Sequence, residues 1–163
     1  MIFVTVGTQL PFDRLVQAVA DWHAENPGVP VTGQVADTRL RPPFPCVAHL
    51  PGPSFDARLR AADLVVSHAG MGTILTCWSL GKPLIVMPRR HDLGEHRSDH
   101  QAATVQHLTA QMTLAVAHSQ ADLCALLYQP WPSLAPRRAA TAGVPRISDY
   151  IQGLLAPSPR AAP

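Results

Sequence analysis

The segment from residue 64 to residue 73 constrains the fold of this chain more than any other stretch. It reads Leu-Val-Val-Ser-His-Ala-Gly-Met-Gly-Thr, an apolar run followed by small residues. A strand that ends at Ser67 and a helix that begins near Gly72 would leave unpaired backbone N–H groups between them. These donors and the positive end of the helix dipole together form a site for a phosphate group.

Three small residues in this segment fit such a site. Gly70 and Gly72 have no Cβ, so the backbone there can approach a ligand closely. Thr73 places a hydroxyl on the first helical turn, where it can cap the helix or bond a phosphate oxygen. Turn glycines are equally typical of a plain strand-to-helix connection. The choice between a phosphate site and a plain turn therefore depends on the rest of the sequence.

Strand and helix patterns alternate along the chain. Apolar runs predict strands over residues 2–6, 31–35, 46–50, 64–67, 84–87 and 113–116. Helical spacing predicts helices over residues 12–25, 54–62, 73–80 and 99–108, and a last helix that ends at 127. We expect Ser54 to cap the second helix, and Ser119 or Asp122 to cap the last one.

This alternation predicts an α/β fold: one Rossmann-like domain with a parallel sheet and helices on both faces. We place the domain at residues 1–128. Residues 129–163 are expected to form a proline-rich linker and a tail, with an amphipathic helix over residues 147–155.

Ligands of such sheets bind outside the carboxyl ends of the strands. Three loops should therefore meet at one edge of the sheet, namely residues 7–12, 68–73 and 88–101. Each of them is rich in groups that can bind a polar ligand.

The loop over residues 88–101 is the most polar of the three, and it allows several interpretations. A metal site is one, because His96 and His100 lie four residues apart with Glu95 and Asp99 close by. However, the spacing does not match the inverted zinc motif, and Gly94 would break the helix that such motifs need. A solvated surface loop is a second interpretation.

A sugar-phosphate site is the third interpretation of this loop, and it fits best. Arg89 and Arg90 can pair with the charges of a diphosphate. The Asp99-His100-Gln101 segment can hydrogen bond to sugar hydroxyls.

Composition excludes several classes of protein. The chain has 163 residues, 47% of them hydrophobic, which is enough for the core of one domain. A net charge of +2 is too small to indicate nucleic-acid binding. The longest apolar runs have the length of strands, and the start of the sequence does not read as a signal peptide, so we expect a cytoplasmic protein.

Several stretches together resemble the C-terminal, nucleotide-sugar-binding half of glycosyltransferase family 28, which has the GT-B fold. The resemblance covers roughly residues 1–128. It is strongest with the small, separate subunits of two-component glycosyltransferases. These include the catalytic subunit of the eukaryotic dolichol-linked N-acetylglucosamine transferase and bacterial exopolysaccharide glucuronosyltransferase subunits. The matching stretches are Ile2–Thr8, Phe12–Leu15, Ser67–Ile74, Gly81–Arg90 and Gly94–Gln101.

The resemblance implies a site for a UDP-sugar donor, with no cofactor and no metal. Gly7 and Thr8 would lie beside the diphosphate, and the donor sugar would lie near the end of the third loop. The residues implied in donor binding are Gly7, Thr8, His68, Ala69, Gly70, Gly72, Thr73, Arg89, Arg90, Glu95, Asp99, His100 and Gln101.

The sequence departs from the family at one position of that site. Many GT-B enzymes have a glutamate three residues after the position of Thr73, where it binds the ribose hydroxyls. Here that residue is Thr76. The ribose contact is therefore missing or supplied elsewhere, with Glu95 as a candidate.

Size is a second departure, because a full GT-B enzyme has two such domains. By resemblance, the acceptor half lies on a membrane-associated partner, which would hold this subunit at the inner face of the membrane. We therefore expect the donor-binding subunit of an inverting UDP-sugar hexosyltransferase that acts on a lipid-linked or exopolysaccharide-precursor acceptor. The catalytic base is expected on the partner, with His68 and Asp13 as the candidates in this chain. A non-catalytic UDP-sugar-binding regulatory subunit and a sugar-nucleotide epimerase-like domain are the alternatives.

Overall fold

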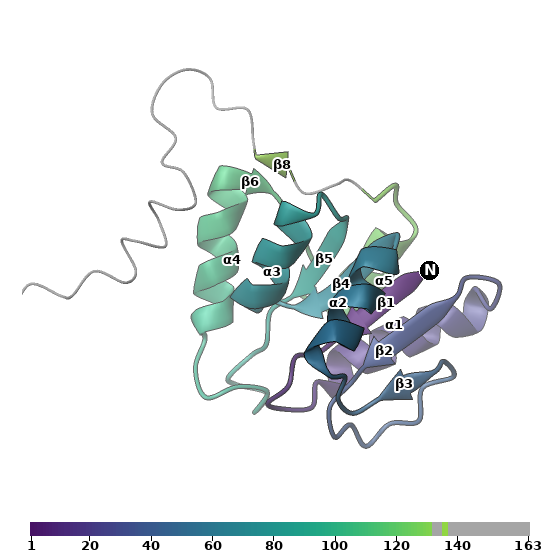
Figure 1. The fold of residues 1–163 in the computed structure, drawn as a ribbon. Helices are drawn as coiled ribbons and strands as arrows, with labels where there is room; N and C mark the ends of the chain where they lie inside the picture. The colour runs from purple at the N-terminus through teal and green to yellow at the C-terminus, as the bar shows by residue number, and fades with distance from the viewer. Residues whose placement is uncertain (132–134, 137–163) are drawn as a thin grey trace, which may run out of the picture.

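The first strand, β1 (Ile2–Thr5), lies in the middle of a six-stranded parallel sheet with the order β3-β2-β1-β4-β5-β7. The computed structural model describes residues 1–131, 135 and 136 (Figure 1). The other strands of the sheet are β2 (Val31–Gln34), β3 (Cys46–Val47), β4 (Leu64–His68), β5 (Leu84–Met87) and β7 (Ala115–Val116). The order reverses between β1 and β4, where ligands of such sheets bind.

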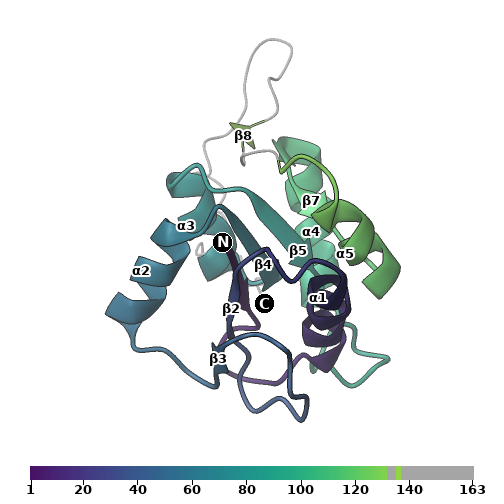
Figure 2. The same ribbon diagram turned by 90° about the vertical axis from the view of Figure 1, so that its right-hand side faces the viewer.

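Helices cover both faces of this sheet, as Figure 2 shows for α1 and α5 on one side and α2 and α3 on the other. α1 (Asp13–Glu25) and α5 (Gln120–Leu127) pack on the face that holds Ile2 and Val4 of β1. α2 (Gly52–Ala61), α3 (Met71–Ser79) and α4 (His100–Gln111) pack on the opposite face with Phe3. Successive strand residues are buried on opposite faces because the side chains of a strand alternate. The predicted single Rossmann-like α/β domain is confirmed.

The start of α2 differs from the prediction. The helix begins at Gly52, with Pro51 at the N-cap, so the predicted cap at Ser54 is wrong. Proline is tolerated in the first helical turn because its missing N–H would have no partner there. The Pro-Gly-Pro segment therefore starts a helix, and the strand before it ends at Val47 rather than at Leu50.

The predicted strand over residues 113–116 is divided in two. β6 (Met112–Thr113) pairs antiparallel with β8 (Ala135–Pro136), whereas β7 extends the parallel sheet. The last helix follows the prediction, because Ser119 and Asp122 form a reciprocal capping box at its start.

The predicted helix over residues 147–155 lies outside the described residues, as does most of the predicted linker. Within the described part of the chain, no helix has the length and apolar character needed to cross a membrane.

Candidate functional site

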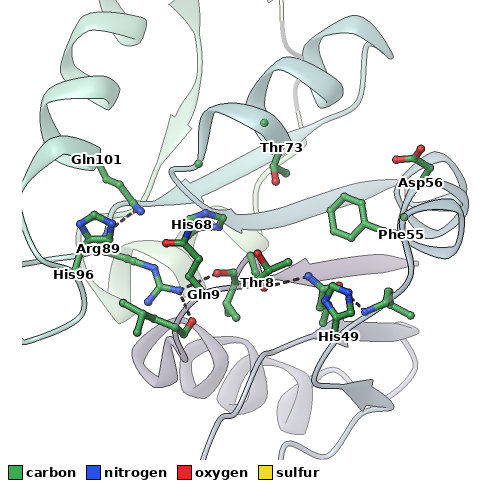
Figure 3. Close-up of a pocket in the computed structure, with 18 residues that line it drawn as sticks. Thr8, Gln9, His49, Phe55, Asp56, His68, Thr73, Arg89, His96 and Gln101 are labelled. Atoms are coloured by element: carbon green, nitrogen blue, oxygen red, sulfur yellow. Dashed lines mark hydrogen bonds between the residues drawn. The ribbon is translucent and has the colours of Figure 1, made fainter.

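A pocket of about 510 Å³ opens at the carboxyl ends of β1, β4 and β5 (Figure 3). All three predicted loops contribute to it. Of the residues predicted to bind the donor, those that line the pocket are Gly7, Thr8, His68, Gly70, Gly72, Thr73, Arg89 and Gln101.

The amino end of α3 opens onto this pocket. Gly70 is the N-cap, in extended conformation, and no side chain caps the helix. The first N–H groups of a helix have no partner inside it, so those of α3 are available to a ligand. Thr73 lines the pocket instead of capping the helix.

The two glycines of this turn have different roles. A Cβ on Gly72 would meet nothing within 4 Å, so this position leaves open space at the amino end of α3. A Cβ on Gly70 would lie 2.3 Å from Nε2 of His68, and one on Gly7 would lie 2.8 Å from Cε1 of the same ring. Gly7 also has a positive φ of 80°, which a side chain rarely adopts. Gly7 and Gly70 therefore make room for the imidazole of His68.

His68 is uncharged at neutral pH. Burial lowers the pKa of its imidazole to about 4, with a further contribution from the nearby Arg89 cation. A neutral imidazole has one nitrogen that donates a hydrogen bond and one that accepts. His68 can therefore hydrogen bond to a ligand but brings no positive charge.

The positive charge at one side of the pocket comes from Arg89, which is only 3% exposed. Its four terminal N–H groups donate to the backbone carbonyls of Val6, Leu10, Pro11 and Glu95. This guanidinium thus holds the loop that contains Gly7 and Thr8, and direct binding of a diphosphate by Arg89 stays a prediction.

Arg89 still acts on the pocket through its charge. Burial lowers the pKa of the guanidinium to about 10, so it is protonated at neutral pH. Among the described residues, no carboxylate forms an ion pair with it. The charge of Glu95 raises the pKa of Arg89, but that carboxylate is ion-paired with Arg14, so one negative charge faces two cations. The remaining positive charge favours an anion in the pocket.

Two further candidates, Arg90 and Glu95, lie outside the residues that line the pocket. The side chain of Arg90 is half exposed and pairs with Asp92. Glu95 binds Arg14 of α1 through both carboxylate oxygens, at 2.7 and 2.8 Å, and also accepts from the backbone N–H of Arg90. Because its oxygens are occupied, Glu95 is not free to bind ribose.

Four other candidates also lie outside this lining. Asp99 is the N-cap residue of α4 and accepts from the backbone N–H of His91, and His100 is exposed. Ala69 is buried. Asp13, the candidate base, accepts a hydrogen bond from the hydroxyl of Thr38.

The structure adds residues that the sequence did not indicate. Gln34 is buried at the end of β2, where its amide donates to Gly7 O and accepts from the N–H of Leu50. It thereby joins two edges of the pocket, and a polar residue at the end of an apolar strand was the available signal. The remaining unpredicted lining residues are Val6, Gln9, Leu10, His49, Leu50, Gly52, Phe55, Asp56 and His96.

The third loop was also considered as a metal site. Within the described part of the chain, no group of three or more His, Cys, Asp or Glu side chains is arranged to hold a metal ion. Nδ1 of His96 instead lies 3.1 Å from the carbonyl of Ser98.

Comparison with known proteins gives a family and a fold. The family model "Glycosyltransferase family 28 C-terminal domain" matches residues 1–129. The structure resembles the glycotransferase of kitacinnamycin, with a TM-score of 0.53, 21% identity and coverage of 76% of this chain and 33% of the other. It also resembles CalG4, the calicheamicin glycosyltransferase, with a TM-score of 0.51, 22% identity and coverage of 77% and 32%. The chain thus spans about one third of the length of these structures, and its sheet matches the C-terminal half of the GT-B fold.

Proposed function

Because the chain belongs to the family of glycosyltransferase family 28 C-terminal domains, we propose that it is the donor-binding subunit of an inverting UDP-sugar glycosyltransferase. One observation carries the proposal: the uncapped amino end of α3 opens onto a pocket that is also lined by the buried cation of Arg89. Free N–H donors and a buried positive charge suit the diphosphate of a sugar nucleotide.

The same groups would assist the reaction. In direct displacement at the anomeric carbon, negative charge develops on the leaving UDP. The N–H groups of α3, the helix dipole and the charge of Arg89 are fixed before the reaction begins, so they stabilise that charge without reorganisation.

The third loop would contact the transferred sugar. His96 and Gln101 line the pocket on the Arg89 side. The side-chain oxygen of Gln101 accepts from the backbone N–H of Arg89, which orients the amide and leaves its NH₂ group for a sugar hydroxyl.

We further propose that a membrane-associated partner subunit supplies the acceptor half and that the acceptor is lipid-linked or an exopolysaccharide precursor. One observation supports this: the described residues that line the pocket all belong to this one domain, which matches the C-terminal half of the GT-B fold. The subunit would then work at the inner face of the membrane through that partner.

Two measurements test the proposal. Calorimetry of the purified chain should show UDP and a UDP-sugar binding to it, and transfer to a lipid-linked acceptor should require added membranes that contain the partner. Binding without transfer in any membrane preparation would instead support a regulatory subunit. Loss of activity with a chelator, restored by zinc, would support the metal interpretation.

A further inference from the structure

The pocket contains one carboxylate among its lining residues, that of Asp56 on α2. This side chain is exposed, and no hydrogen bond or ion pair within the described residues occupies it. The other acid considered for hydroxyl binding, Glu95, is bound to Arg14. Thr76 is also occupied, because its hydroxyl donates to the carbonyl of Gly72. Asp56 is therefore the acid available to a ligand in this pocket.

Charge is distributed unequally across the pocket (Figure 3). Arg89, His96 and Gln101 lie on one side, whereas Asp56 lies on the other with Phe55, and His68 lies between the two sides. A carboxylate repels phosphate oxygens but accepts hydrogen bonds from hydroxyl groups. We therefore expect the part of a ligand that lies at Asp56 to be uncharged and rich in O–H donors.

The surroundings of Asp56 favour a nucleoside over a second sugar. Phe55 lies beside it, Leu50 also lines the pocket, and both offer apolar surface for the flat base. The two hydroxyls of a ribose are adjacent, so they can donate to the two oxygens of one carboxylate. Resting on the proposed function, we propose that Asp56 binds the ribose hydroxyls of the sugar nucleotide and thereby sets the direction in which the donor lies.

Calorimetry with three ligands distinguishes a hydrogen bond between Asp56 and the ribose from a general effect of the negative charge. UDP, 2′-deoxy-UDP and pyrophosphate are each titrated into wild type and into Asp56→Ala. We expect Asp56→Ala to weaken the binding of UDP about tenfold or more, because hydrogen bonds to a charged acceptor are lost. Pyrophosphate should bind at least as tightly as before, because a repelling charge has gone. The 2′-deoxy-UDP should bind wild type more weakly than UDP does, and the substitution should affect it less.

Asp21→Ala is the matched control, because it removes an exposed acid of α1 that does not line the pocket. It should leave all three affinities unchanged. Equal affinity of wild type for UDP and 2′-deoxy-UDP, or tighter binding of UDP to Asp56→Ala, would overturn the ribose contact. The contact would also be overturned if Asp56→Ala bound a UDP-sugar more weakly than wild type does but bound UDP with unchanged affinity. Asp56 would then contact the transferred sugar. Failure of wild type to bind both UDP and pyrophosphate would instead overturn the proposed function.

Discussion

The imidazole of His68 occupies the space that a side chain on Gly70 would need, since a Cβ there would lie 2.3 Å from Nε2 of the ring. Gly7 borders the same ring from the loop after β1. The ends of two neighbouring strands are thus packed around one histidine, so the shape of the pocket floor depends on all three residues.

We expect Gly70→Ala to lower the free energy of unfolding by about 1–3 kcal/mol, because the ring must move to avoid the new methyl group. The double variant His68→Ala, Gly70→Ala should show less than the sum of the two single losses. Urea denaturation measures both. Gly72→Ala is the control, since it meets nothing within 4 Å and should not destabilise the fold. An additive double variant would contradict the packing of these residues.

Gly72→Val should leave the fold intact and weaken the binding of UDP about tenfold or more. The new side chain extends into open space at the amino end of α3, where the diphosphate is proposed to lie. Circular dichroism checks the fold, and calorimetry measures the affinity. A folded variant with unchanged affinity would place the diphosphate elsewhere.

The stability of the protein should fall between pH 6.5 and pH 4. The pKa of His68 is about 4 in the folded state, below its usual value of 6.5, so the unfolded chain binds the additional proton in this range. The free energy of unfolding therefore decreases as the pH falls, by about 1–3 kcal/mol from this residue. Urea denaturation at pH 7 and pH 4.5 measures the change, and His68→Asn should reduce it. An identical pH dependence in the variant would show that His68 is not the cause.

The two adjacent arginines should behave differently. Arg89→Lys should lower the free energy of unfolding by about 2–4 kcal/mol, because a lysine cannot serve the four carbonyls that surround the buried guanidinium. Arg90→Ala should have almost no effect, because exposed ion pairs contribute little. Thermal denaturation of both variants checks this. A stable Arg89→Lys protein that has lost only UDP affinity would support Arg89 as a direct ligand of the diphosphate.

Gln101→Ala should reduce turnover of the sugar nucleotide more than it reduces the affinity for UDP, since its amide is proposed to contact the sugar. Steady-state kinetics in the presence of the partner membranes, together with calorimetry, separate the two effects. His100→Ala, which alters an exposed neighbour that does not line the pocket, is the control. Equal losses of turnover and affinity would mean that Gln101 supports the loop without contacting the sugar.

The sequence by itself determined the α/β architecture and the place of the pocket. Alternating strand and helix periods are local properties, and parallel strands bring their carboxyl ends to one edge. The glycine-rich segment 67–74 could therefore be placed at the site from its residues and their spacing alone. Gly72 and Thr73 of this segment line the pocket.

Only the tertiary structure decided which polar groups are free to act. Glu95 and Arg14 are 81 residues apart in sequence, and Arg89 donates to carbonyls up to 83 residues away. Residues so distant meet only when the chain packs, so local spacing could not distinguish an arginine that binds a diphosphate from one that holds a loop. The contribution of α2 to the pocket also depends on packing. Asp56 lies in this helix and lines the pocket, but the sequence of the helix contains no ligand motif. Local spacing identifies which segments meet, whereas the partners of each side chain depend on long-range contacts.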